Sequence, residues 1–204
     1  LASQQTDSQL TSAMQASNPL MYPDQDFNPA RDLAPVGITG ALPNVLVVHP
    51  SSGIKTLAEL VAKGKAKNAQ LNFATFGPGS SPHFYGTLFQ KATQVAAEPI
   101  AYKGSGDAAK DMLAGRIDYM FDSMTTAIAN VKAEKLVALA ITSPQRSPLL
   151  PDVPTLKELG YGAADVNFWL TLQVPAKTPP EMVAALRQAV SKAVQDPESK
   201  HNVA

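Results

Sequence analysis

Short apolar runs alternate with helix-like segments through the middle of the chain. The apolar runs have the length of strands and lie at residues 45–48, 71–76, 99–102, 117–121 and 136–141. The segments between them space their apolar residues as helices do and lie at residues 56–67, 81–93, 107–114 and 125–134. This regular alternation predicts an α/β fold with a mostly parallel sheet that helices cover on both faces.

Capping-box patterns mark three helix starts. A threonine is followed three positions later by a glutamate at Thr56/Glu59, Thr155/Glu158 and Thr178/Glu181. After the third box, apolar residues recur every four positions, at Met182, Leu186, Val190 and Val194. This spacing predicts a C-terminal helix with one apolar stripe.

The two ends of the chain carry less apolar surface than the middle. Residues 1–35 predict a short helix near 8–17 and a helical turn at 29–33 that begins at Asn28. Residues 166–174 predict a long strand. Neither end has enough apolar surface for a domain of its own. We therefore expect residues 1–38 and 168–204 to form a partial first lobe, and residues 39–167 to form a second lobe.

Composition excludes several classes of function. The chain has no cysteine, which excludes disulfides, thiol catalysis and Cys-ligated zinc. Its 17 basic and 17 acidic residues balance, so charge gives no reason to expect nucleic acid as a partner. Its 3 histidines have no metal-binding spacing, and we expect neither a metal nor a cofactor. No apolar run reaches the ~20 residues that span a bilayer. The chain starts at Leu1, so we expect a processed or truncated beginning.

The turn between the apolar run at 71–76 and the next helix is the first candidate binding site. Gly77 and Gly79 permit tight backbone conformations, and Ser81 can cap the helix that follows. The turn would place free amides and the hydroxyls of Ser80 and Ser81 at the carboxyl end of a strand, where anions and other ligands bind in α/β sheets. An ordinary capped turn is the alternative interpretation.

Further candidates follow other predicted strands or lie near the chain ends. After two strands come Tyr102, Lys103, Gly104, Ser105, Asp122 and Ser123. A lysine such as Lys103 is more often solvated than bound to a ligand, and Asp122 either accepts a hydrogen bond from a ligand or caps the next helix. Uncharged donors precede the first predicted helix at Ser3, Gln4, Gln5 and Thr6. Phe168 and Trp169 would form an apolar wall for a ligand or part of the core, and for Trp169 the core is the stronger expectation.

An ordered set of motifs resembles the Bug family, the periplasmic receptors of tripartite tricarboxylate transporters. The matching segments are residues 32–36, 43–50, 73–83, 102–105, 118–122, 139–143, 146–155 and 175–179. Each is weak alone, but together they appear in the family's order along almost the whole chain. The family normally opens with a strand, a Pro-Pro-Gly-Gly loop and a helix that this sequence does not contain, so the resemblance implies an incomplete first lobe.

The resemblance implies a type II periplasmic-binding fold, in which two α/β lobes, each with a central mostly parallel sheet flanked by helices, close on a ligand. The ligand's carboxylate would be held by backbone amides, hydroxyls and water. Residues that match the family's second-lobe carboxylate loop are Gly79, Ser80, Ser81 and His83, and Tyr102 to Ser105 with Asp122 match the neighbouring rim. Ser3 to Thr6 match a first-lobe loop that usually reads Gly, Thr and Ser, and the two glutamines depart from that pattern.

The function implied by this resemblance is capture of a small carboxylate in the periplasm for delivery to membrane permease subunits. We expect a monomer that is not an enzyme. One alternative is the effector-sensing domain of a transcription regulator, which would carry a helix-turn-helix upstream. Another is a hydrolase that uses Ser80 or Ser81 with His83, although the sequence has no GxSxG elbow.

Overall fold

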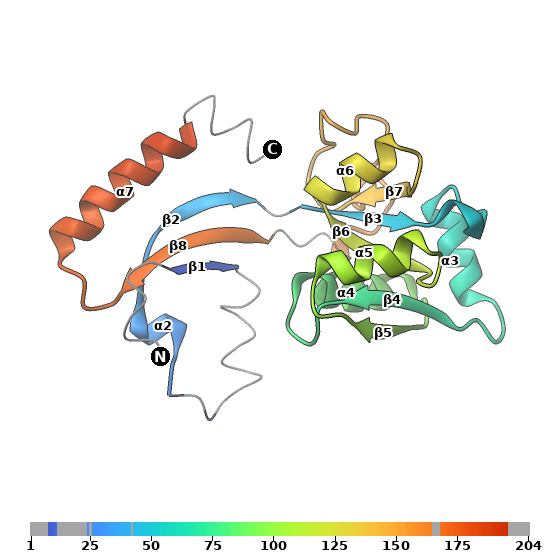
Figure 1. The fold of residues 1–204 in the computed structure, drawn as a ribbon, viewed down its shortest axis with the longest axis horizontal. Coiled ribbons are helices and arrows are strands. Elements are labelled where there is room, and N and C mark those ends of the chain that lie inside the picture. The colour runs from blue at the N-terminus through green and yellow to red at the C-terminus, as the bar shows by residue number, and fades with distance from the viewer. Residues whose placement is uncertain (1–7, 12–23, 25, 42, 165–167, 196–204) are drawn as a thin grey trace. The chain divides into compact units, whose positions relative to one another are not determined.

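The computed structural model describes residues 8–11, 24, 26–41, 43–164 and 168–195. The chain forms two compact units (Figure 1). The larger unit is Pro43–Asn167, and the smaller unit combines Leu1–Leu42 with Phe168–Ala204. Each unit has a sheet of its own, and each is described by itself below.

The larger unit is built on a five-stranded sheet with the order β5-β4-β6-β3-β7. Its strands are β3 (Asn44–Val48), β4 (Leu71–Thr75), β5 (Ala97–Ala101), β6 (Tyr119–Ser123) and β7 (Val137–Ile141). β4 pairs in parallel with β5 and β6, whereas β3 is antiparallel to both β6 and β7. The predicted mostly parallel sheet is therefore confirmed here, with β3 as the reversed strand. All residues of β3 are buried, and a strand that is apolar on both faces does not encode its own direction.

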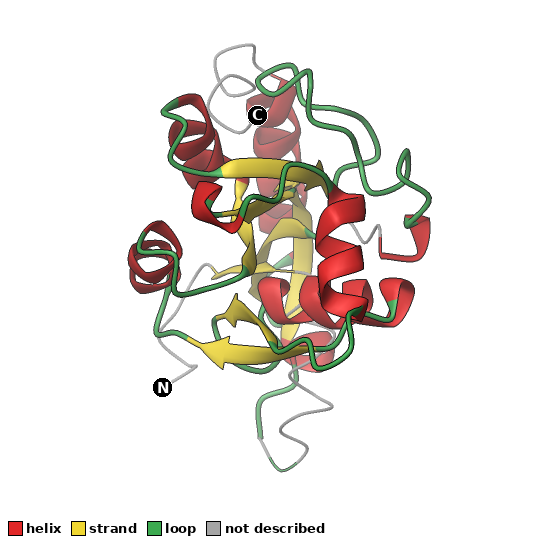
Figure 2. Ribbon diagram, turned by 90° about the vertical axis from the view of Figure 1, so that its right-hand side faces the viewer, coloured by secondary structure: helices red, strands yellow, loops and turns green. Residues whose placement is uncertain are grey.

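The four helices predicted for the middle of the chain are present. They are α3 (Leu57–Lys65), α4 (Ser81–Thr93), α5 (Ser105–Leu113) and α6 (Met124–Lys132), with short 3-10 turns at Pro50–Ser52 and Gly162–Ala164. Helices lie on both faces of the sheet (Figure 2). The first capping box is fully formed, since Thr56 Oγ1 accepts from the Glu59 amide at 3.3 Å and the Glu59 carboxylate accepts from the Thr56 amide at 3.1 Å. Local side-chain chemistry thus sets the start of α3 where the sequence predicts it.

An aromatic cluster joins α4 to the sheet. Its rings belong to Phe73, Tyr85, Phe89, Tyr119 and Phe121, all at most 1% exposed. The Phe89 ring contacts Tyr119 at 5.7 Å and Phe121 at 5.9 Å between centroids, both edge to face. Gly86 lets the helix approach closely, because a Cβ there would lie 2.0 Å from Cε2 of Phe73. These contacts fix α4, and with it the turn that begins α4, against the strands.

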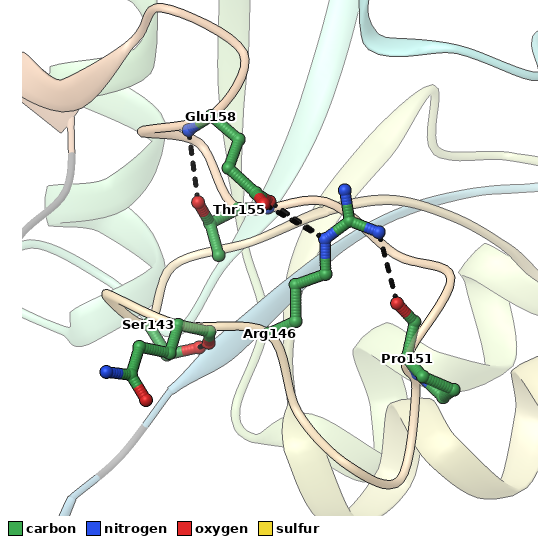
Figure 3. A network of polar contacts seen from close by, with 6 residues as sticks. Ser143, Arg146, Pro151, Thr155 and Glu158 are labelled. Atoms are coloured by element: carbon green, nitrogen blue, oxygen red, sulfur yellow. Dashed lines mark hydrogen bonds and ion pairs between the residues drawn. The ribbon is translucent and has the colours of Figure 1, made fainter.

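A polar network organises the segment that follows β7 (Figure 3). Arg146 Nε donates to both carboxylate oxygens of Glu158 at 3.1 and 3.0 Å, and its Nη1 donates to the Pro151 carbonyl at 3.2 Å. The second capping box is formed between Thr155 and Glu158, but it closes a turn instead of starting a regular helix. The arginine and the backbone amide of Thr155 lower the pKa of Glu158, the amide more than the arginine. Because Arg146 and Glu158 are both about half exposed, the ion pair adds little by itself, and the shared backbone bonds hold the segment.

The smaller unit has a three-stranded antiparallel sheet with the order β1-β8-β2. Its elements are β1 (Ser8–Thr11), α2 (Pro29–Asp32), β2 (Leu33–Ala41), β8 (Trp169–Pro175) and α7 (Pro180–Gln195). Asn28 caps α2 by accepting from the Ala30 amide at 3.0 Å, as predicted. Two expectations are wrong: this sheet is antiparallel and not mostly parallel, and Ser8–Thr11 is a strand where a helix was expected. The strand β2 was not predicted. The strand conformation of β1 comes from pairing with a distant strand, which overrides local propensity.

The third helix start leads to α7, which packs on the smaller sheet. Val183, Leu186 and Val190 contact a cluster with Val36 and Val174 at its centre. The predicted stripe is correct at Leu186 and Val190 but wrong at its ends, since the C-terminal valine is exposed and the methionine before Val183 is 55% exposed. The buried stripe therefore follows the spacing i, i+3, i+7, which a strict four-residue repeat does not describe.

Candidate ligand-binding site

Three strand-to-helix turns of the larger unit meet at one edge of its sheet. Because β4, β5 and β6 run in the same direction, α4, α5 and α6 all begin at the carboxyl edge. The reversed strand β3 brings its first residue, Asn44, to the same edge, where it pairs with Ser123. Ligands of open α/β sheets bind at this edge.

The start of α4 has backbone amides that no side chain caps. Ser80 occupies the N-cap position, yet its hydroxyl donates to the Gly77 carbonyl at 2.7 Å and accepts from the Phe76 amide at 3.3 Å. Ser81 was expected as the cap, and this is wrong: it is the first helical residue. Among the described residues, nothing accepts from the amides of Ser81 and His83. Such a helix start favours an anion.

Two glycines give this turn its shape. Gly77 has φ of +93° and Gly79 has φ of +79°, in the left-handed region that other residues rarely adopt. The Gly77 amide donates to Thr75 Oγ1 at 3.1 Å, which ties the turn to the end of β4. The backbone of Gly79 is buried, and the side chains of Ser80 and Ser81 are half-buried. The expectation of a tight turn at these glycines is confirmed.

The start of α5 resembles that of α4 in lacking a side-chain cap. Gly104 is the N-cap residue and Ser105 is the first helical residue. Lys103 is exposed, whereas Tyr102 is half-buried and its hydroxyl donates to Asp111 Oδ2 at 3.0 Å. Burial, and then this hydrogen bond, raise the pKa of the Tyr102 phenol. The Tyr102 hydroxyl is thus bonded to α5. The backbone amides at the start of α5 are the groups there that can bind a ligand.

The start of α6 contains a buried carboxylate. The Asp122 side chain is 1% exposed, and its Oδ1 accepts from the Ser123 amide at 2.8 Å and from Thr126 Oγ1 at 2.5 Å. Ser123 caps the helix through a long bond of 3.5 Å from the Thr126 amide. Asp122 Oδ2 has no hydrogen-bond partner among the described residues. Burial raises the pKa of Asp122, and the bonds from Thr126 and Ser123 offset part of that rise.

The raised pKa of Asp122 predicts how stability depends on pH. A carboxyl with a higher pKa in the folded than in the unfolded state contributes stability at low pH and loses it as the pH rises through the folded value. Urea unfolding should therefore show that the wild-type chain loses stability relative to Asp122→Asn over the pH range above about 4, the ordinary pKa of an aspartate. Carboxyls with lowered pKa, such as Glu59, have the opposite slope, but they cancel in this difference. A constant difference across this range would contradict the prediction.

Asn44 and Thr142 belong to this edge but were not predicted. Asn44 is 6% exposed, and its Nδ2 donates to the Phe121 carbonyl at 2.8 Å. The Asn44 amide donates to Thr142 Oγ1 at 2.9 Å, and the Thr142 amide donates back to the Asn44 carbonyl at 2.9 Å. These bonds join the ends of β6 and β7 through β3. The one signal in the sequence is a polar residue, Asn44, at the start of an apolar run. It places Asn44 at the carboxyl edge only if β3 runs opposite to its neighbours, and the sequence does not show that direction.

The other predicted site residues belong to the smaller unit or lie outside the described residues. Ser3 to Thr6 lie outside the described residues. Phe168 and Trp169 belong to the smaller unit, where Phe168 is 7% exposed and Trp169 is 40% exposed. The stronger expectation for Trp169, a place in the core, is therefore wrong. Trp169 is the first residue of β8, which Figure 1 shows between β1 and β2.

Three further features bear on the kind of site. In the part of the chain that the structure describes, no group of three or more His, Asp or Glu side chains could hold a metal ion. No helix within the same residues is long and apolar enough to cross a membrane. The hydroxyl of Ser80 donates to the Gly77 carbonyl and not to His83, so the geometry of a serine nucleophile beside its base is not formed there.

The fold and this edge define an α/β ligand-binding protein of the periplasmic binding-protein class. The chain belongs to the tripartite tricarboxylate transporter receptor family (TctC), whose pattern its residues 6–204 match. Protein BugT of Bordetella pertussis (strain Tohama I) is 34% identical over 175 residues, which are 86% of this chain and 54% of BugT. The chain thus spans about half the length of the curated relatives it matches.

Solved structures of similar proteins agree with this class. The periplasmic binding protein BugD matches with a TM-score of 0.83 and 28% identity, over 96% of this chain and 65% of BugD. MatC from Rhodopseudomonas palustris, determined with malate, matches with a TM-score of 0.82 and 27% identity, over 95% of this chain and 66% of MatC. Another R. palustris protein, determined with adipate, matches with a TM-score of 0.84 and 27% identity, over 94% of this chain and 64% of that protein. The family is one of periplasmic receptors and not of enzymes.

Proposed function

We propose that this protein is a periplasmic receptor that binds a small carboxylate and delivers it to the permease subunits of a tripartite tricarboxylate-type transporter, without catalysing a reaction. The observation that carries the proposal is the pair of helix starts, α4 and α5, that lack side-chain caps and follow neighbouring parallel strands. We propose further that the two compact units are the two lobes of the receptor and that the ligand's carboxylate binds the amides of these helix starts.

Neutral donors are sufficient for such binding. Micromolar affinity requires about 8 kcal/mol. A hydrogen bond to a charged group contributes roughly 1.5–3 kcal/mol, and a helix start contributes about 0.3–1 kcal/mol. Four or five donors would therefore reach micromolar affinity, even after the cost of ordering and desolvation reduces the sum.

The similar structures favour dicarboxylates as the first ligands to test. Malate and adipate, found in two of them, both carry two carboxylates on a short carbon chain. We therefore propose a short dicarboxylate as the ligand class, with the helix starts of the larger unit holding one of its carboxylates.

A calorimetric panel tests this proposal. Succinate, malate, adipate and citrate would be titrated into the chain, with succinamide as a matched neutral control. We expect saturable binding of at least one acid, no binding of the diamide, and a raised melting temperature. Ligand at 100 times its Kd should add about 2.7 kcal/mol of stability. If no acid on the panel produces heat or a thermal shift, the proposal is wrong.

A further inference from the structure

We infer that Asp122 Oδ2 accepts a hydrogen bond from the ligand, so that the protein selects acids that carry an O–H or N–H donor beside the carboxylate. This inference rests on the proposed function and specifies the ligand more closely. It starts from one buried carboxylate oxygen that has no partner among the described residues.

The position of Asp122 places this oxygen on the candidate binding edge. β6 is the middle strand of the five, and Asp122 is its penultimate residue. On one side lies β4, which leads into the uncapped start of α4, and on the other side lies Asn44 at the start of β3. The backbone amides at the start of α4, which can donate to a ligand carboxylate, and Asp122 Oδ2, which can accept from a ligand O–H or N–H, therefore lie at the same end of adjacent strands.

The other carboxylate oxygen, Oδ1, accepts two hydrogen bonds, and these bonds fix the orientation of the Asp122 carboxylate. Asp122 Oδ1 accepts from the Ser123 amide and from the Thr126 hydroxyl, both of which belong to the rigid junction of β6 and α6. The carboxylate cannot turn Oδ2 toward these donors without losing the bonds to Oδ1. Oδ2 is thus an oriented acceptor that has no donor among the described residues of its unit.

Burial makes this acceptor selective. A buried carboxylate oxygen without a donor has lost its hydrogen bonds to water and gained none in return, and a ligand donor would remove that cost. The same oxygen would repel the oxygens of a second carboxylate, so a ligand without a donor at this point gains nothing and is disfavoured. An internal water on Oδ2 would also satisfy it, but it would not distinguish among ligands.

Three acids with the same carbon skeleton separate these possibilities. Succinate, malate and aspartate differ only in carrying a hydrogen, a hydroxyl or an ammonium group at C2. In the wild-type chain, calorimetry should give malate, aspartate or both an affinity at least about 10-fold higher than succinate, which corresponds to one good hydrogen bond. The comparison of malate with aspartate then identifies the donor as a hydroxyl or an ammonium.

Asp122→Asn should abolish this preference. Its amide oxygen can keep the bonds from Ser123 and Thr126, which places the amide nitrogen, a donor, where Oδ2 was. The affinity ratio to succinate should then fall to about 1 or below. A second variant, Thr126→Val, releases Oδ1 and should weaken the preference in the same direction. Asp118→Asn is the matched control at the other end of β6, where Asp118 bonds Lys63 and the Asn72 amide, and it should leave the preference unchanged.

The outcomes distinguish the inference from the proposed function. Equal binding of the three acids by the wild-type chain, or an unchanged preference in a folded Asp122→Asn, would overturn the inference and leave the carboxylate receptor intact. Loss of the preference in Asp118→Asn as well would also overturn it, because the effect would then follow from net charge alone. If none of these or the other panel acids binds, the proposed function itself fails.

Discussion

Proline in place of Ser81 should weaken dicarboxylate binding by about 10- to 100-fold while α4 stays folded. The substitution removes one backbone donor at the helix start, and a hydrogen bond to a charged group contributes roughly 1.5–3 kcal/mol. Proline suits the first position of a helix, where Ser81 lies. The preceding residue, Ser80, already has φ of −74° and ψ of 155°, which a following proline permits. Calorimetry with malate measures the loss.

Ser81→Ala is the matched control for that variant. It removes the hydroxyl and keeps the amide, so it separates the side chain from the backbone donor. We expect Ser81→Ala to lose much less affinity than Ser81→Pro. If the two variants bind malate equally well and as tightly as the wild-type chain, the amide of Ser81 is not part of the site.

Alanine in place of Phe89 should lower the free energy of unfolding by about 3–5 kcal/mol. Phe89 is fully buried and its ring contacts Tyr119, Phe121 and Tyr161, so its removal leaves a cavity among rigid aromatic neighbours. These contacts also attach α4 to the sheet. Urea unfolding followed by near-ultraviolet circular dichroism would report the loss in the larger unit.

Leu159→Ala in the same unit provides the comparison. Leu159 is 38% exposed, so its truncation should change the free energy of unfolding by no more than about 1 kcal/mol. An effect of Phe89→Ala as small as that of Leu159→Ala would show that the aromatic cluster does not hold α4. The placement of the binding turn would then need another explanation.

The order of strands and helices in the larger unit is predictable because its signals are local. The start of α3 depends on Thr56 and Glu59, and the bend before α4 depends on Gly77 and Gly79, all within a few residues of the element they shape. The same local reasoning identified the α4 turn as the first candidate site. Its detail was wrong by one residue, since Ser80 and not Ser81 is the N-cap.

The features that could not be predicted, such as strand β2 and the direction of β3, depend on pairing with strands that lie far away along the chain. β2 contains Pro35, Gly37 and Gly40, which indicate a loop, and it becomes a strand by pairing with β8 across irregularities in register. The direction of β3 is likewise set by β6 and β7, and it alone brings Asn44 to the binding edge. The sequence also does not show that Asp122 Oδ2 is buried without a partner among the described residues, because this depends on how distant strands and helices pack around it.

Backbone amide shifts in a ¹⁵N-labelled chain titrated with malate test most directly whether the carboxyl edge of the larger sheet is the binding site. The account predicts that the largest saturable shifts fall on the amides of Ser81, His83 and Ser105, and that the neutral malamide leaves them in place. Shifts confined to the opposite edge of the sheet, around His49 and Lys63, would contradict it.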